Sequence, residues 1–250
     1  MNMTMRTDGI VIREQNTGEQ DRLVTILTKE KGIIKAFVNG GRNPKNKNVS
    51  STGLLCYSDF SVDKTKKDVY FIKEATSKKV FFSLRQDIID LSLAQYLSEL
   101  AYELAPREEE AGEFLPLLLN SLHLIATKNK DVLLVKTVAE LRMLTLSGYM
   151  PELVACKKCG QFESEKMYLD PFTGELFCDE CRPASKVYEM NSGVVRAMRH
   201  ICLSDNAKIF SFTLPPESLV CLSEISEKYL LNITNRKFKT LSFYKKMTEF

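Results

Sequence analysis

Apolar and polar residues alternate in short runs over the first eighty residues, a pattern typical of β-strands. Five such runs are rich in β-branched and aromatic residues and are separated by polar turns. In the turn before the third run, Gly32 is expected to take a positive φ. The predicted strands cover residues 9–13, 23–27, 33–38, 54–62 and 69–75. Five short strands indicate a small barrel, and the OB-fold is a five-stranded barrel that binds nucleic acid.

The spacing of apolar residues changes near Leu84, after which they recur every three or four positions, as on one face of a helix. Asp131 is a plausible N-cap and Gly148 a plausible C′ residue for the third of the predicted helices. Consecutive helices with short connections indicate a bundle. The predicted helices cover residues 84–104, 114–127, 131–146, 192–202 and 216–231.

Two pairs of cysteines carry the sharpest chemistry in the sequence. Cys156 and Cys159 form one C-x2-C pair, Cys178 and Cys181 form the other, and eighteen residues separate the pairs. This spacing is typical of a four-thiolate zinc site. Strand-like segments flank a turn between the pairs and form a hairpin that brings them together. The sequence therefore predicts one Zn²⁺ in a zinc ribbon.

A site with four cysteine ligands has no open position for water, so the predicted zinc is structural. The alternatives are a pair of redox disulfides or unligated thiols. A thioredoxin-like site requires a βαβ unit, and no such pattern is visible. Cys56, Cys202 and Cys221 lie in apolar contexts and are expected to be small core residues.

These patterns together predict an α+β protein with an N-terminal five-stranded OB-fold barrel and a helical domain that carries an inserted four-cysteine zinc ribbon. Four segments are expected. They are a nucleic-acid-binding OB-fold over 1–80, a helical bundle over 81–153, the four-cysteine ribbon over 154–183, and a C-terminal helical segment packing with the bundle over 184–250.

Charge is distributed unevenly along the chain, although the formal net charge is only +3. Residues 1–80 hold 15 Lys and Arg against 9 Asp and Glu, whereas the remaining 170 residues hold 20 against 23. A basic N-terminal third joined to a slightly acidic remainder suggests that the first part has a polyanionic partner.

The loop over 39–52 carries Arg42, Lys45 and Lys47 and no acidic residue. One-sided charge favours phosphate contact over a merely solvated loop, and Arg13 and Lys35 on adjoining strands are weaker candidates. The nearby aromatic residues could stack on bases, but inward packing in the barrel is favoured for them. These are Phe37, Tyr57 and Phe60.

A second basic stretch over 236–246 could also contact nucleic acid, with a solvated tail as a nearly equal alternative. His123 and His200 are far apart in sequence, and the common hydrolase and NTPase motifs are missing, so no enzymatic activity is predicted. The sequence shows no signal peptide and no membrane-spanning stretch. A cytoplasmic protein is expected.

Three segments resemble the bacterial RecO family of recombination mediators. The first runs from Gly9 through Gly18 to Gly40-Gly41-Arg42, the second from Gly148-Tyr149-Met150-Pro151 to Cys159-Gly160, and the third from Asp170-Pro171 through Gly174 to Cys181. The combination is specific because its order and spacing cover nearly the whole chain.

The resemblance implies binding of single- and double-stranded DNA, annealing of complementary strands, association with the nucleoid, and work with RecR to load RecA onto DNA coated by single-stranded DNA-binding protein. The acidic C-terminal tail of that protein is expected to bind the helical body. Lys136 and Arg142 could edge a groove for this tail, or could simply be solvated. The rival interpretation is a zinc-ribbon adaptor for other proteins, with incidental DNA binding.

Overall fold

The structure is a computed structural model that describes residues 3–66 and 69–248. The chain forms two compact units. Unit 1 contains the chain up to Ala126 together with the residues from Thr240 onward, and unit 2 contains Thr127–Lys239. The first and last described residues, Met3 and Thr248, therefore belong to the same unit. The four-segment division expected from the sequence stays a prediction, and the two units divide the predicted helical bundle at residue 126.

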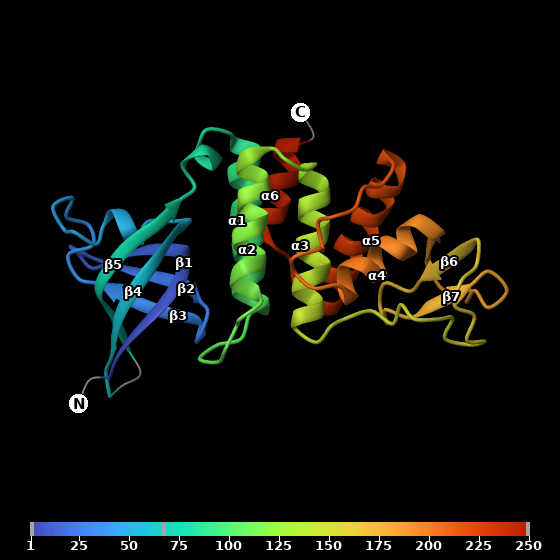
Figure 1. Cartoon of the computed structure of the whole chain (residues 1–250), viewed down its shortest axis with the longest axis horizontal. Coiled ribbons are helices and arrows are strands. Elements are labelled where there is room, and N and C mark those ends of the chain that lie inside the picture. Colours follow the sequence, from blue (N-terminus) through green and yellow to red (C-terminus); the bar gives the residue numbers. More distant parts are fainter. Residues whose placement is uncertain (1–2, 67–68, 249–250) are drawn as a thin grey trace. The chain divides into compact units, whose positions relative to one another are not determined.

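Five strands of unit 1 close into a barrel in the order β1-β2-β3-β5-β4, with β1 also paired to β4 (Figure 1). All neighbours are antiparallel except β3 and β5, which are parallel. This arrangement confirms the predicted OB-like barrel. The strands are β1 (Met3–Thr17), β2 (Asp21–Thr28), β3 (Gly32–Val38), β4 (Cys56–Lys64) and β5 (Tyr70–Val80).

Strand β1 is three times longer than the predicted strand because its two halves have different partners. Residues 3–10 pair with β4, and residues 9–17 pair with β2. Gly9 lies where the pairings overlap, and a Cβ atom there would stand 2.6 Å from Cγ2 of Ile26. Glycine therefore allows the close approach of β1 to β2, and the register of this pair shifts between Val11 and Arg13. The pattern of apolar residues does not reveal the full length of β1, because the residues before Gly9 and after Arg13 are mostly polar.

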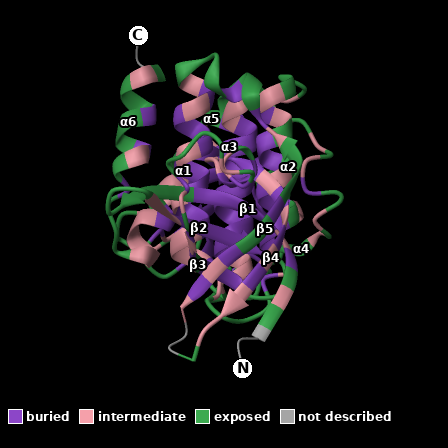
Figure 2. Cartoon of the chain, turned by 90° about the vertical axis from the view of Figure 1, so that its left-hand side faces the viewer, coloured by how far each residue is buried: buried purple, intermediate pink, exposed green. Residues whose placement is uncertain are grey.

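The barrel interior is filled by aliphatic side chains and the rings of Phe60 and Tyr70. Figure 2 shows buried positions along all five strands. Gly32 has the predicted positive φ, at 55°. It lies against the segment that follows α1 (Ile88–Leu104), where the Ile33 N–H donates to Pro106 O at 2.9 Å. The turn between β2 and β3 is thus fixed to the helical part of unit 1.

Three α-helices complete the described part of unit 1. Helix α1 starts four residues later than predicted because a short 3-10 helix covers Phe82–Arg85 and Asp87 caps α1, its Oδ1 accepting from the Ile89 N–H at 2.8 Å. Helix α2 (Phe114–Thr127) has the predicted bounds. Helix α6 (Lys239–Thr248) was not predicted, and Glu99 of α1 accepts hydrogen bonds from Thr240 at its start.

Unit 2 consists of three packed helices and a three-stranded sheet. Helix α3 packs against α4 and α5, and Asp131 caps α3 as predicted, accepting from the Leu133 N–H at 2.7 Å. Gly148 follows α3 with a φ of 84°, also as predicted. The sheet has the order β7-β6-β8. The elements are α3 (Val132–Leu146), β6 (Lys166–Leu169), β7 (Leu176–Cys178), β8 (Tyr188–Asn191), α4 (Ser192–Leu203) and α5 (Pro216–Thr234).

Lys136 and Arg142 do not edge an open groove, so that expectation was wrong. Lys136 is 2% exposed and pairs with Glu140 and Glu227 at 2.8 and 3.1 Å. Arg142 is also buried and donates to Cys202 O and Asn206 Oδ1. Both cations join α3 to neighbouring segments of unit 2. Their burial is tolerated because each is paired or hydrogen-bonded.

Candidate metal centre and nucleic-acid interface

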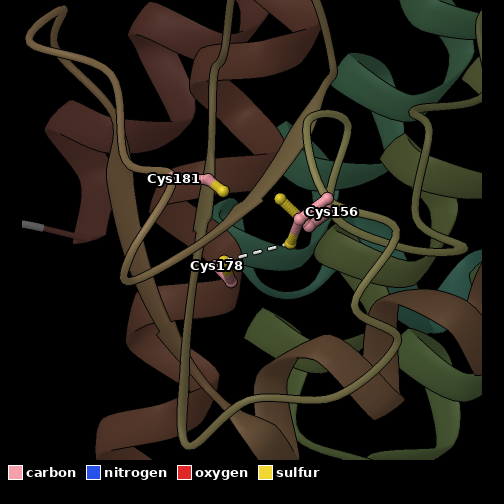
Figure 3. A group of neighbouring side chains, drawn as sticks. Cys156, Cys178 and Cys181 are labelled. Atoms are coloured by element: carbon pink, nitrogen blue, oxygen red, sulfur yellow. Dashed lines mark hydrogen bonds between the residues drawn. The ribbon is translucent and has the colours of Figure 1, made fainter.

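The four cysteines of the ribbon converge. The Sγ atoms of Cys156, Cys159, Cys178 and Cys181 all lie within 4.8 Å of one another. Figure 3 shows the labelled Cys156, Cys178 and Cys181 side chains turned toward one shared space. Four thiolates at the usual zinc distance of about 2.3 Å would be about 3.8 Å apart in a tetrahedron. The donor set therefore fits a four-coordinate metal ion with little contraction.

Tight turns aim each pair of thiols at this space. The Gly160 N–H donates to Cys156 O at 2.9 Å, and the Cys181 N–H donates to Cys178 O at 3.2 Å. Gly160 has a φ of 75°, which a side chain would oppose. Strands β6 and β7 form the predicted hairpin, since Met167 is the register partner of Cys178. Sequence spacing and structure thus agree on how the two pairs meet.

The thiols have unequal proton affinities. Burial raises the pKa of Cys156, but the backbone N–H groups of Cys159, Cys178 and Lys158 outweigh it and lower this pKa to about 6. Hydrogen bonding to the other thiols, Cys159 first, raises the pKa of Cys181 to about 12. The first thiolate is thus stabilised by backbone donors, and further thiolates close to it are disfavoured. A cation at the centre would remove this repulsion.

The ribbon contacts the segment that precedes it and helix α5, which follows it in the chain. The Glu152 N–H donates to Gly174 O at 2.8 Å, and the Tyr229 hydroxyl of α5 donates to Tyr149 O at 3.1 Å. Gly174 has a φ of 74°, and a Cβ there would stand 2.9 Å from the Tyr229 oxygen. Lys157 forms ion pairs with Glu152 and Glu175. The ribbon is therefore joined to the helices of unit 2 by hydrogen bonds and ion pairs.

The basic loop of the barrel is ordered by hydrogen bonds within the loop and to neighbouring strands. The Gly40 N–H donates to Asp21 Oδ1 at 2.8 Å, and Gly40 has a φ of 62°. Asn46 Nδ2 donates to Asn39 O, while Asn48 Oδ1 accepts from the Ala75 N–H of β5. The loop is therefore held against the turn between β1 and β2 and against β5. Its cations project from a fixed backbone.

The three loop cations are all exposed, but their neighbours differ. Arg42 donates to Gly18 O at 3.2 Å, and Lys47 forms an ion pair with Glu74 of β5 at 3.0 Å. Lys45 has no ion-pair partner among the described residues. The loop itself contains no acidic residue, so the sequence did not indicate the pairing of Lys47 with Glu74, which lies on β5. An ion pair this exposed contributes little and can be exchanged for a phosphate.

Arg13 and Lys35 form a second basic group, which also contains two residues that the sequence did not single out. Arg13 is the register partner of Thr25, which in turn pairs with Lys35, so all three lie in one row across β1, β2 and β3. The charged groups of Arg13 and Lys35 stand 5.3 and 5.9 Å from the centre of the Tyr102 ring. Arg107 stands 4.9 Å from the same centre. We call Arg13, Lys35, Tyr102 and Arg107 the Tyr102 cluster.

Inward packing was favoured for the three aromatic residues near the basic loop, and only one of them is fully buried. Phe60 is fully buried in the barrel core, as favoured. Tyr57 is half-buried and donates to Asp8 Oδ2 at 3.2 Å. Phe37 is also half-buried, and its ring stacks on Phe71 of β5 with the centroids 5.5 Å apart. Only a closed barrel places Phe37 beside Phe71, so the sequence could not show this pair.

The remaining sequence candidates have structural environments. The basic stretch over 236–246 is not a loose tail, because Phe238, Leu241 and Tyr244 are buried. His123 is exposed, with its ring nitrogen 3.2 Å from Lys79 Nζ. His200 lies in the last turn of α4, where its Nε2 is 2.9 Å from Lys208 O. None of the helices in the described part of the chain is long and apolar enough to cross a membrane.

Comparison with known proteins identifies the family. Residues 1–81 match the N-terminal domain of recombination protein O, and residues 85–242 match its C-terminal domain. The chain is 32% identical over 242 residues to the DNA repair protein RecO of Acetivibrio thermocellus, covering 96% of both chains. It is 27% identical over 247 residues to that of Alkaliphilus metalliredigens, covering 98% of this chain and 100% of the relative. The chain therefore belongs to the RecO family of DNA repair and recombination proteins.

Proposed function

We propose that this chain binds single- and double-stranded DNA through the outer surface of its barrel and anneals complementary strands. The observation that carries the proposal is the set of exposed cations on fixed backbone at Arg42, Lys45 and Lys47. Arg13 and Lys35 of the Tyr102 cluster extend the basic surface across three strands. Because the backbone of the loop is already ordered, only the side chains lose conformational freedom when they bind phosphate.

The mechanism we propose is electrostatic. Each Lys or Arg that contacts a phosphate releases counterions, which makes binding favourable and dependent on salt. Cations that neutralise the phosphates of two strands lower the repulsion between them, and base pairing then selects the complementary sequence. Phosphate contacts carry no base information, so this binding is expected to be nearly independent of sequence. No bond is made or broken, and we propose that the protein is not an enzyme.

We further propose that the metal of the ribbon is one structural Zn²⁺. All four donors are cysteine thiols, and soft thiolates in a tetrahedral set favour zinc. Cys156, Cys159, Cys178 and Cys181 would fill all four positions, which leaves none for a reacting water. Bound zinc would hold the hairpin of β6 and β7 to the loop that precedes it.

The geometry alone does not identify partners for this chain, so those proposed here rest on its membership of the RecO family. We propose that the chain works with RecR to load RecA onto DNA coated by single-stranded DNA-binding protein, and that it binds the C-terminal tail of that protein. The place of action would be the nucleoid in the cytoplasm. Lys136 and Arg142 are buried and take no part in the proposed tail site.

Strand annealing tests the proposal. Complementary oligonucleotides coated with single-stranded DNA-binding protein are mixed with and without the chain, and duplex formation is followed by fluorescence energy transfer. The chain is expected to accelerate annealing at low salt, with a steep loss as salt rises. No acceleration, together with binding that hardly depends on salt, would contradict the proposal and favour an adaptor that binds other proteins.

A further inference from the structure

A pair of aromatic rings lies on the outer face of the barrel. Phe37 of β3 and Phe71 of β5 are register partners in the parallel pair, and their planes meet at 27°. Their neighbours along each strand, Ala36 and Val38 on β3 and Tyr70 on β5, are buried. Successive side chains of a strand point to opposite faces. The two rings therefore belong to the solvent side of the barrel, and each stays partly exposed.

Cationic side chains flank these rings on the same strands. Lys35 precedes Phe37 by two residues and Lys73 follows Phe71 by two, and both lysines are exposed. Residues two apart on a regular strand share a face and stand roughly 7 Å from each other, which applies to Lys35 and Phe37. The register between β4 and β5 skips Lys73, so Lys73 lies in a bulge, and its exposure places it on the solvent side. Lys35 also belongs to the Tyr102 cluster, and Lys73 is 3.8 Å from Asp63. An apolar aromatic surface thus lies between two cations.

We infer that the stacked pair Phe37–Phe71 is a platform for unpaired nucleic-acid bases. A base on the platform would have its phosphates within reach of Lys35 and Lys73. Both side chains are long and exposed, and each lies two residues from one of the rings. Every base has a π-face, so a platform of this kind accepts any sequence. The bases of a duplex have their faces covered by their neighbours. The platform therefore favours single strands, whereas the loop cations accept phosphates of either form.

This inference rests on the proposed DNA binding, and it adds a preference for strands that carry bases, which phosphate contacts cannot provide. Exposed lysines and arginines respond to charge and do not distinguish a strand with bases from one without them. The platform predicts such a distinction. An oligonucleotide of abasic residues has the same phosphates as an ordinary one but offers nothing to stack. The intact protein can therefore test the inference without any substitution.

The experiment measures affinities by fluorescence anisotropy for an ordinary single strand, an abasic strand of equal length and a duplex. The unmodified protein is expected to bind the ordinary strand roughly 5- to 150-fold more tightly than the abasic one, since stacking of one base is of that order. A variant with Phe37→Leu and Phe71→Leu should lose this preference and keep its affinity for duplex. Phe172→Leu, at an exposed ring of unit 2, is the matched control and should change neither affinity.

Each result has a distinct meaning. Equal affinity of the unmodified protein for ordinary and abasic strands overturns the platform, while the proposed phosphate binding stands. Failure to bind any of the three ligands at low salt overturns the proposed function itself. If the double leucine variant does not fold, Phe37→Tyr keeps an aromatic ring and should keep the preference. A folded double variant that still prefers the ordinary strand also overturns the inference.

Discussion

Lys136 Nζ lies 2.8 Å from Glu140 Oε1, one helical turn later on α3, and both side chains are almost completely buried. Glu227 of α5 completes the group at 3.1 Å from the same nitrogen. Burial lowers the pKa of Lys136, but the two carboxylates outweigh it and raise this pKa above its usual value. The lysine is therefore charged in the folded protein and joins α3 to α5.

Replacing Lys136 with Met should destabilise unit 2 by about 3–5 kcal/mol, because it leaves the Glu140 carboxylate buried without its cation. Urea denaturation monitored by circular dichroism measures the change. Adding Glu140→Leu to the same variant should restore much of the loss, since an apolar pair of similar volume replaces the ions. Lys228→Met removes an exposed lysine of α5 and should change stability by less than about 0.5 kcal/mol. Equal effects of the two lysine substitutions would contradict this account.

The folded pKa of Lys136 is raised, so its contribution to stability is fully present below the pKa of the unfolded lysine, about 10.4. The contribution is lost only as pH rises through the folded value. Stability from this group should therefore be constant around neutral pH and decline in alkaline solution. The difference in unfolding free energy between the native protein and Lys136→Met, measured from pH 7 to pH 11, checks the direction. A larger difference at high pH would oppose it.

Gly32 lies directly against the segment that follows α1 in unit 1. A Cβ at Gly32 would stand 2.1 Å from Pro106 O, in addition to the strain of its positive φ. Gly32→Ala should therefore destabilise the protein by clearly more than the roughly 1–2 kcal/mol that positive φ costs a residue with a side chain. Gly18 has a φ of 60° and nothing within 4 Å of its added Cβ. Gly18→Ala isolates the cost of the positive φ alone. Thermal melting should therefore give Gly32→Ala a lower Tm than Gly18→Ala.

Removing one ribbon thiol should abolish metal binding. Cys178→Ser deletes one of the four donors, and structural zinc contributes about 10–16 kcal/mol in small ribbons and fingers. The variant is expected to lose its bound zinc in elemental analysis and to lose hydrogen-exchange protection in β6 and β7. Cys221→Ser changes a cysteine outside the cluster and should keep one zinc for each chain. Zinc retained in full by Cys178→Ser would contradict the four-thiolate site.

The cysteine cluster could be predicted because its ligands lie in two short local motifs. Cys156 and Cys159 are brought together by one turn, and a single hairpin adds Cys178 and Cys181. The barrel could also be anticipated from alternating apolar runs. Helix α6 was missed because its ten residues are mostly polar and include three lysines, and only Leu241 and Tyr244 are buried.

The basic surface could be predicted only in part, because closure of the barrel decides which side chains become neighbours. Arg42, Lys45 and Lys47 share one loop and were visible in the sequence. Arg107 and Tyr102 join Arg13 and Lys35 from a helix and its connection, about seventy to ninety residues away in the chain. Glu74 reaches Lys47 in the same way. Nonlocal contacts of this kind leave no periodic signal in a single sequence.

The salt dependence of single-strand binding tests the central claim most directly. Changing Arg42, Lys45 and Lys47 together to Ala should flatten the slope of log K against log salt by about 2, from three phosphate contacts at about 0.7 each. Lys186, Lys208 and Lys228 are exposed residues of unit 2, and their replacement by Ala removes the same charge. That control should leave the slope nearly unchanged. Equal slopes for the loop variant and the unmodified protein would contradict phosphate binding by the loop.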